Sequence, residues 1–288
     1  MLHSGVFRMV AAQIAFTAMV VFVKIARQEL STFEVAFWRS ILVLPLLWAL
    51  LGRSGWRINR KGTMLLRAVL GFGALCSFFG AVKGLTIADL SLISKIQPVL
   101  VAVLAPLLIG GTEKPEPWLW AVMGVALAGC VLLLAPSLQV GSLYGLMAVS
   151  AAIFSAGAHT CLRLLKQENP IAVVVWFQVG TAILGAMACV LSLGSIPLPP
   201  NHLWGALLAV GVFAGLGQLL MTAAYKVERA PVVATASYVG PVFAVIADVI
   251  AFADWPTYIS LLGGTVVISA GLVLLWKSSP RTGERSEP

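Results

Sequence analysis

Charged residues are scarce in this chain of 288 residues. Only 10% of the residues are charged and 60% are hydrophobic, whereas soluble domains carry roughly 25% charged residues. A soluble domain of this size must still cover itself with polar surface, and too few polar residues are present to do so. This shortage excludes an ordinary cytosolic enzyme and indicates that lipid surrounds most of the chain.

Motifs for nucleotide, metal or protease chemistry are missing as well. The sequence contains no G-x-x-x-x-G-K-[ST] loop, no H-E-x-x-H pair and no strand context for a dinucleotide-binding glycine motif. All four cysteines fall inside apolar runs without C-x-x-C or Cys/His spacing, and are interpreted as buried apolar side chains. We therefore expect no ATP hydrolysis, no catalytic residues, no metal site and no cofactor.

What the sequence does contain is ten continuous apolar runs. A helix of about 20 apolar residues crosses a bilayer core of about 30 Å. Barrel strands would instead show alternation over about ten residues, which these runs lack. The sequence therefore predicts an all-α integral membrane protein with ten transmembrane helices. The predicted spans are Val6–Val23, Val35–Leu51, Met64–Val82, Leu90–Ile109, Trp118–Ala135, Leu143–Leu162, Ile171–Leu191, Leu203–Ala224, Val232–Phe252 and Tyr258–Trp276.

The basic residues are distributed unevenly between the two sides of these spans. Fourteen Lys and Arg, among them Arg67, are assigned to the side of the N-terminus and three to the other side, while Arg39 and Lys95 lie within spans. The positive-inside rule then predicts that both termini are cytoplasmic. Because this bias accounts for the net charge of +8, we expect the lipid bilayer, and no nucleic acid, as the partner of the basic loops.

The two halves of the chain repeat each other at offsets of 138 to 143 residues. Each half holds five predicted spans, an odd number, so the second half must enter the membrane from the opposite face. We expect two inverted five-helix repeats, residues 1–137 and 138–276, followed by a polar cytoplasmic tail, 277–288. Such symmetry is typical of secondary transporters. Matched pairs include Phe16 with Phe154, Trp38 with Trp176, Ser94 with Ser237 and Pro98 with Pro241.

Three short stretches carry a family resemblance. They are Phe37-Trp38-Arg39-Ser40, Gln97-Pro98-Val99 and Tyr238-Val239-Gly240-Pro241. With these and the five-plus-five layout, the sequence resembles the EamA-type branch of the drug/metabolite transporter superfamily, and most of all the YddG-type aromatic amino acid exporters. The resemblance implies a basket-like pseudo-symmetric bundle in which helices 1, 3, 4, 6, 8 and 9 wall a central cavity and helices 5 and 10 pack outside it.

The resemblance also implies a function. It implies a secondary transporter in the bacterial inner membrane that exports small organic solutes, above all aromatic and neutral amino acids, by alternating access. The open alternatives are another drug/metabolite-type carrier, for a cationic xenobiotic or another metabolite, a passive channel and an intramembrane enzyme. We expect a small-molecule substrate and no obligatory protein partner.

Polar and aromatic side chains within the spans are the candidate substrate-binding residues, because polar groups are costly in lipid. Lys95 is interpreted either as a cation of the cavity, placed to meet a substrate carboxylate, or as a snorkelling anchor. His159 is interpreted as a proton-carrying or ligand residue or as polar packing. Arg39 and Asp248 are interpreted as an ion pair, as separate snorkelling anchors or as substrate-binding residues. The candidates are Gln13, Phe16, Phe78, Phe79, Ser91, Ser94, Lys95, Pro98, Ser155, His159, Gln218, Thr235, Ser237, Tyr238 and Pro241.

Overall fold

The computed structural model describes residues 5–52, 55–85, 87–134, 142–252 and 255–278, except for the side chains of 87–89, 91, 248, 251 and 252. Every regular element in these ranges is a helix. The α-helices are α1 (Gly5–Ala26), α2 (Thr32–Leu51), α3 (Lys61–Ala81), α4 (Ile87–Ser94), α5 (Ile96–Leu108), α6 (Pro117–Leu134), α7 (Leu143–Leu164), α8 (Pro170–Leu193), α9 (Trp204–Val227), α10 (Ala230–Ala236), α11 (Gly240–Phe252) and α12 (Tyr258–Ser278), with short 3-10 helices η1 (Gly111–Glu113), η2 (Asn201–Leu203) and η3 (Ser237–Val239) between them.

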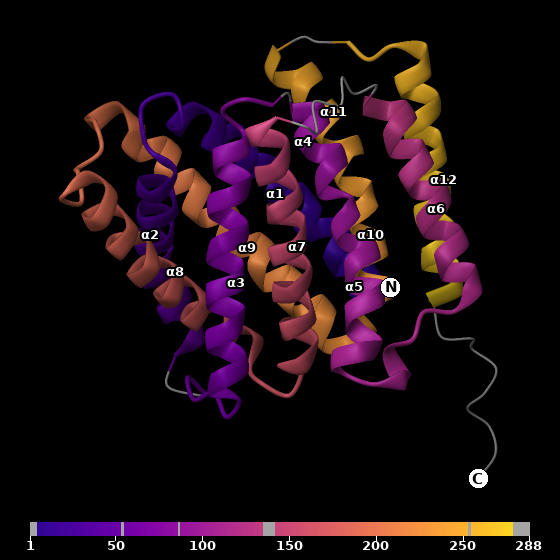
Figure 1. Ribbon diagram of the computed structural model, residues 1–288, viewed down its shortest axis with the longest axis horizontal. Helices are drawn as coiled ribbons and strands as arrows, with labels where there is room; N and C mark the ends of the chain where they lie inside the picture. The colour runs from indigo at the N-terminus through magenta and orange to yellow at the C-terminus, as the bar shows by residue number, and fades with distance from the viewer. Residues whose placement is uncertain (1–4, 53–54, 86, 135–141, 253–254, 279–288) are drawn as a thin grey trace.

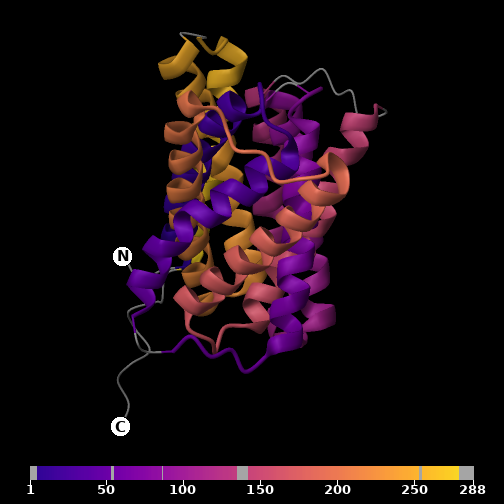
Figure 2. The same ribbon diagram turned by 90° about the vertical axis from the view of Figure 1, so that its left-hand side faces the viewer.

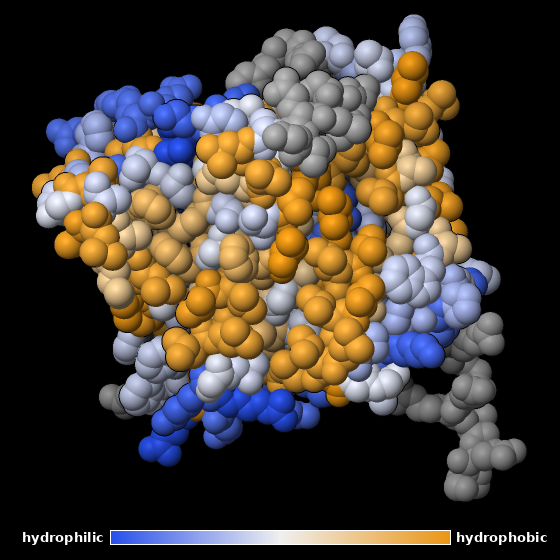
Figure 3. Space-filling view, viewed as in Figure 1, coloured by the Kyte–Doolittle hydropathy of each residue, from blue (hydrophilic) through white to orange (hydrophobic). Residues whose placement is uncertain are grey.

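The lengths and hydropathy of these helices suit a membrane. Among the described residues, nine helices are long and apolar enough to cross a bilayer, and a further apolar helix, Leu92–Leu108, is shorter. Figure 3 shows apolar side chains over the middle of one face of the molecule, with hydrophilic ones along its lower edge and at its upper left. Leu107, Leu191 and Ile250 are each at least three-quarters exposed, as expected of side chains that face lipid. The predicted all-helical membrane architecture is confirmed.

Four helix pairs form most of the bundle. Helix α1 packs along α9, α3 along α7, α2 along α8 and α6 along α12. Figure 1 shows α6 and α12 together at one side of the bundle, and Figure 2 gives the view turned by 90°. The last pair is brought close by glycine, since a Cβ on Gly263 would lie 2.7 Å from the carbonyl oxygen of Gly129.

Two predicted spans are interrupted rather than continuous. The helix of the fourth span stops at Ser94 and restarts at Ile96, and that of the ninth span passes through the 3-10 turn Ser237–Val239. In both spans the interruption lies next to the serine four residues before a proline, Ser94 before Pro98 and Ser237 before Pro241. A proline lacks the N–H that would bond the carbonyl four residues earlier, and its ring clashes with that carbonyl. Pro98 and Pro241 therefore break their helices at Ser94 and Ser237.

Arg39 needs a corrected interpretation. Arg39 belongs to α2, and only 1% of its surface is exposed. Its Nη1 donates to Sδ of Met19 at 3.7 Å. Arg39 is therefore not a snorkelling anchor, because its guanidinium is enclosed by the bundle. The proposed partner, Asp248, has its side chain outside the described part of the chain.

Candidate substrate-binding site

The helices enclose a cavity of about 290 Å³, close to the lower end of the roughly 300–1,000 Å³ range of small-molecule pockets. Its wall comes from α1, α3, the α4–α5 break, α7, α9 and the η3–α11 segment, with Phe177 added from α8. Among the described residues, α6 and α12 contribute none to this wall. The wall thus comes from the helices that the family resemblance implies.

The cavity is not centred between the two faces of the bundle but extends toward one of them. It extends to Lys24 in the last turn of α1 and to Val82 just after α3. At the other end it stops at Met9, Arg67 and His159, which lie four to six residues from the ends of their helices, or about 6–9 Å at about 1.5 Å per residue. We call the face where α1 ends the open face and the face where α1 begins the closed face.

Lys95 lies in the break between α4 and α5. Its ammonium donates to the carbonyl oxygen of Ser237 at 3.0 Å, and its own carbonyl accepts from the hydroxyl of Tyr238 at 3.1 Å. Two hydrogen bonds in opposite directions therefore connect the two interrupted helices, and both are accepted by backbone carbonyls at the breaks. Lys95 is buried, lines the cavity and lies eight residues into the helix that starts at Ile87, or about 12 Å. The structure places it in the cavity wall and not at the membrane edge.

Arg67 is a site residue that the sequence interpretation missed. It was assigned to the loop charges of the cytoplasmic side, but it lies within α3 with 2% of its surface exposed. Its Nη2 donates to Oε1 of Gln218 at 2.8 Å, and its Cζ lies 4.0 Å from the ring centroid of Phe177. The signal was available, because Arg67 falls inside the apolar run Met64–Val82. Removing it from the count leaves thirteen basic residues against three, so the charge bias remains.

Polar side chains at the floor of the cavity hydrogen-bond one another. Nδ1 of His159 lies 2.9 Å from Nε2 of Gln97, and both residues line the cavity. The His159 ring also packs at 5.6 Å from that of Tyr225. With the Gln97 amide in this orientation, Nε2 donates and Nδ1 of His159 accepts. The sequence had indicated Gln97 only as part of the Gln-Pro motif.

Most of the predicted candidates line this one cavity. Pro98 is buried in α5 and does not line the cavity. Thr235 and Tyr238 border a second, apolar cavity of about 140 Å³ beside α12, and the Thr235 hydroxyl donates to the carbonyl of Pro231. Ser91 has its side chain outside the described residues. The candidates in the wall are Gln13, Phe16, Phe78, Phe79, Ser94, Lys95, Ser155, His159, Gln218, Ser237 and Pro241.

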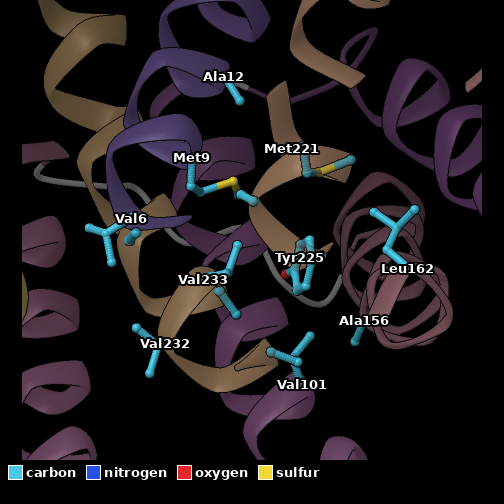
Figure 4. Close-up of a cluster of buried hydrophobic side chains, with 14 of the residues drawn as sticks. Val6, Met9, Ala12, Val101, Ala156, Leu162, Met221, Tyr225, Val232 and Val233 are labelled. Carbon is cyan, nitrogen blue, oxygen red and sulfur yellow. The ribbon is translucent and has the colours of Figure 1, made fainter. Parts of the chain in front are cut away.

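The closed face is sealed by packed side chains just beyond the floor. Figure 4 shows Tyr225 and Val233 below Met9, Val101 further down and Leu162 to the right; these four residues belong to α9, α10, α5 and α7. All of them are at most 2% exposed. Among the described residues, these packed side chains separate the cavity from the closed face.

A buried ion pair reinforces this seal. Glu113 accepts from Nε of Arg163 at 2.6 Å and from the backbone N–H of Ala230 at 2.7 Å, while Nη1 of Arg163 donates to the carbonyl of Tyr225. These bonds connect η1, α7, α9 and α10 at the closed face. We call Glu113 and Arg163 the closed-face pair.

A second pair on the same face is more exposed. Arg229 donates to Glu116 at 3.0 Å, and hydrogen bonds from Trp118 and Arg229 hold the pKa of Glu116 below its ordinary value. Because both side chains are in contact with solvent, this pair contributes little to stability.

Among the described residues, the charged side chains that line the cavity are all positive. Arg67 and Lys95 are buried in its wall, Lys24 lies exposed at its open end, and none of the described lining residues is Asp or Glu. Arg39 lies just behind the wall, within electrostatic reach of Arg67. Buried cations in a region of low dielectric are unfavourable unless a counter-charge is supplied. The arrangement therefore suits an anionic group of a small molecule.

Known proteins that resemble this chain are transporters. The Pseudopaline exporter CntI of Pseudomonas aeruginosa is 29% identical over 95% of this chain and 96% of its own length. The Riboflavin transporter of Brucella anthropi is 27% identical over 94% of this chain and 98% of its own length. A crystal structure with 20% sequence identity matches 93% of this chain and 98% of that chain with a TM-score of 0.76, which shows a shared fold.

The family match covers nearly the whole chain in two parts. The sequence profile of the EamA-like transporter family matches residues 3–135 and again residues 142–276. These segments contain all the helices that wall the cavity and both pairs at the closed face. The chain therefore belongs to the EamA-like transporter family.

Proposed function

We propose that this protein is a secondary transporter of the bacterial inner membrane that exports a small organic solute carrying a carboxylate group. The observation that carries the proposal is the ammonium of Lys95 in the cavity wall, bonded to the neutral carbonyl of Ser237. An ammonium has three donors, so a substrate carboxylate can accept from Lys95 while the bond to Ser237 persists. Charge-assisted hydrogen bonds of this kind are roughly twice as strong as neutral ones.

Aromatic and neutral amino acids are the first substrates to test. Each carries a carboxylate for Lys95, and Phe16 and Phe78 in the wall offer rings for an aromatic side chain. A cationic xenobiotic is disfavoured, because Arg67 and Lys95 would repel it and no described acidic side chain of the wall would attract it. The relatives named above, an exporter and a vitamin transporter, support a small-molecule substrate but do not specify its class.

In an alternating-access mechanism, the open and closed faces correspond to the two sides of the membrane. With both termini in the cytoplasm, as the basic residues predict, the cavity extends toward the outside and the seal of Val101, Leu162 and Tyr225 faces the cytoplasm. Export then requires this seal and the closed-face pair to separate, so that the same cavity takes up its solute from the cytoplasm. Two inverted halves that rock against each other would achieve this exchange.

Purified protein in liposomes tests the substrate class. Initial rates of uptake of labelled tryptophan, phenylalanine, threonine and methionine, with and without a pH gradient, should saturate with concentration for at least one substrate. Lys95→Met keeps roughly the same volume and removes the charge, so it should lower the rate at limiting substrate about tenfold, the value of one charged hydrogen bond. Lys83→Met, in the exposed turn after α3, is the matched control and should transport normally.

Two results would contradict this proposal. The first is the absence of saturable flux for every carboxylate tested in a folded preparation. The second is equal half-saturation and rate for Lys95→Met and the unchanged protein. A folded state is verified independently by a single symmetric peak in gel filtration and by an unchanged midpoint of thermal unfolding.

A further inference from the structure

Arg67 has more hydrogen-bonding capacity than its surroundings use. A guanidinium offers five N–H donors, and among the described residues only Gln218 accepts from it, through Nη2. Its Nε is buried without a hydrogen-bond partner in the described part of the chain. A buried arginine of structural function is normally paired with a carboxylate, and the three ion pairs between described side chains include neither Arg67 nor Lys95.

The environment of Arg67 fixes the position of its guanidinium. The ring of Phe177 packs beneath it at 4.0 Å, and Gly71, one turn further along α3, leaves room for it. A Cβ on Gly71 would lie 2.3 Å from Nη1 of Arg67 and 2.5 Å from the Phe177 ring. The absence of a side chain at position 71 thus allows this cation to lie at the cavity floor.

Two buried cations therefore line one cavity at separate positions, apart from the exposed Lys24 at its open end. Lys95 lies at the helix breaks beside Gly240 and Gln13, and Arg67 lies at the floor beside Gln218 and His159. We infer that Arg67 forms a second anion-binding position, and that the transported substrate carries at least two anionic groups, one for Lys95 and one for Arg67. This inference rests on the proposed function and specifies the substrate class of the same cavity.

The balance of charge favours a dianion over a zwitterion. A neutral amino acid would place one carboxylate at Lys95 but would also bring an ammonium into a cavity with two cations, where its repulsion is weakly screened. A dicarboxylate neutralises both cations and adds no positive charge. Specificity of this kind arises as much from repulsion of the wrong molecule as from attraction of the right one. The rings of Phe16 and Phe78 in the same wall offer an apolar surface for the rest of such a molecule.

A set of ligands built on the same phenyl ring tests this inference by binding. Phenylsuccinate has two carboxylates, phenylpropionate has one, phenylalanine is zwitterionic and phenethylamine is a cation. Binding to the full chain in nanodiscs is measured from the ligand-dependent rise in unfolding temperature, since a ligand stabilises the state that binds it. We expect phenylsuccinate to bind about tenfold more tightly than phenylpropionate, the effect of one more charged hydrogen bond, and phenethylamine to bind more weakly than either.

Variants of Arg67 and of its neighbour Gly71 test whether Arg67 binds the second carboxylate. Arg67→Gln should remove the advantage of phenylsuccinate while leaving phenylpropionate binding at Lys95, and Arg67→Lys should keep part of that advantage because it keeps the charge. Gly71→Ala displaces the guanidinium without changing it, so it should also reduce the advantage. Gly62→Ala, on the same helix with open space around its Cβ, is the matched control. If Arg67→Gln fails to fold, Gly71→Ala alone tests whether the position of the Arg67 guanidinium determines the advantage of phenylsuccinate.

The outcomes separate this inference from the proposed function. Equal affinities for phenylsuccinate and phenylpropionate, or an advantage that survives both Arg67→Gln and Gly71→Ala, would overturn the two-anion inference. The proposed function would still stand in that case if amino acids show saturable flux that depends on Lys95. No saturable flux of any mono- or dicarboxylate would instead overturn the proposed function.

Discussion

Glu113 and Arg163 show how single residues hold one face of the bundle shut. Glu113 is 1% exposed and binds two partners at once, the Arg163 guanidinium and the N–H of Ala230. Breaking a buried ion pair leaves an uncompensated charge and costs about 3–5 kcal/mol. Opening the closed face must separate Glu113 from Arg163 and from the N–H of Ala230, so these contacts favour the conformation observed.

Glu113→Gln should loosen the closed face, because it keeps an acceptor for Ala230 but removes the charge that binds Arg163. The reporter is Cys161, a buried thiol on α7 two residues before Arg163. We expect its rate of maleimide labelling, followed by mass spectrometry of the labelled peptide, to rise about tenfold. Glu116→Gln, in the exposed pair on the same face, is the control and should leave the rate unchanged. Equal labelling rates for Glu113→Gln and the unchanged protein would show that this pair does not hold the face closed.

At the scale of elements, the sequence predicted where the helices lie but not where two of them break. Pro98 and Pro241 lie within two of the predicted spans. The observed breaks lie at the carbonyls four residues earlier, and they are completed by Lys95 and Tyr238, which bond across the two helices. That reciprocity depends on residues far apart in the sequence, so no local pattern could reveal it.

The sequence also did not show which side of each helix faces the interior of the bundle. In a membrane both the lipid-facing and the buried sides of a helix are apolar, so periodicity gives little information about which side faces the bundle. Arg67 and Gln97 therefore escaped notice, although both lie in the cavity wall, whereas Tyr238 was expected there and lies behind it. The helices that wall the cavity were predicted correctly only through the family resemblance.

The packing of α6 against α12 gives an element-scale prediction. A Cβ on Gly263 would lie 2.2 Å from the backbone N of Leu133 and 2.7 Å from the carbonyl oxygen of Gly129. Backbone atoms cannot yield as a flexible side chain can, so Gly263→Ala should force the two helices apart and lower stability by about 1–3 kcal/mol. Thermal unfolding in detergent measures the loss.

A control on the same helix pair isolates the effect of close packing. Gly124 on α6 has open space where its Cβ would lie, so Gly124→Ala should be neutral or slightly stabilising through better helix propensity. If Gly263→Ala unfolds at the same temperature as Gly124→Ala, the close approach of α6 and α12 is not as described.

At the scale of the whole molecule, the helix pairs agree with the predicted relation between the halves. The first half contributes α1, α2, α3 and α6, and each pairs with a helix of the second half, α9, α8, α7 and α12. If α1 corresponds to α7 and α3 to α9, as the sequence repeat predicts, then the α1–α9 and α3–α7 pairs are exchanged by a twofold rotation. The inverted repeat itself remains a prediction, as does the cytoplasmic location of the termini.

The central claim is that one cavity serves a solute from both faces in turn, and counterflow tests it most directly. Liposomes that contain only this protein are loaded with unlabelled substrate and placed in a trace of labelled substrate, using phenylsuccinate and phenylalanine in separate runs. A carrier predicts a transient accumulation of label above its equilibrium level, because the internal substrate occupies the cavity on its return. We expect this overshoot for a carboxylate-bearing substrate, and expect Lys95→Met to diminish it. Flux of label that reaches equilibrium without an overshoot, and that increases linearly with concentration, would contradict the account and indicate a channel.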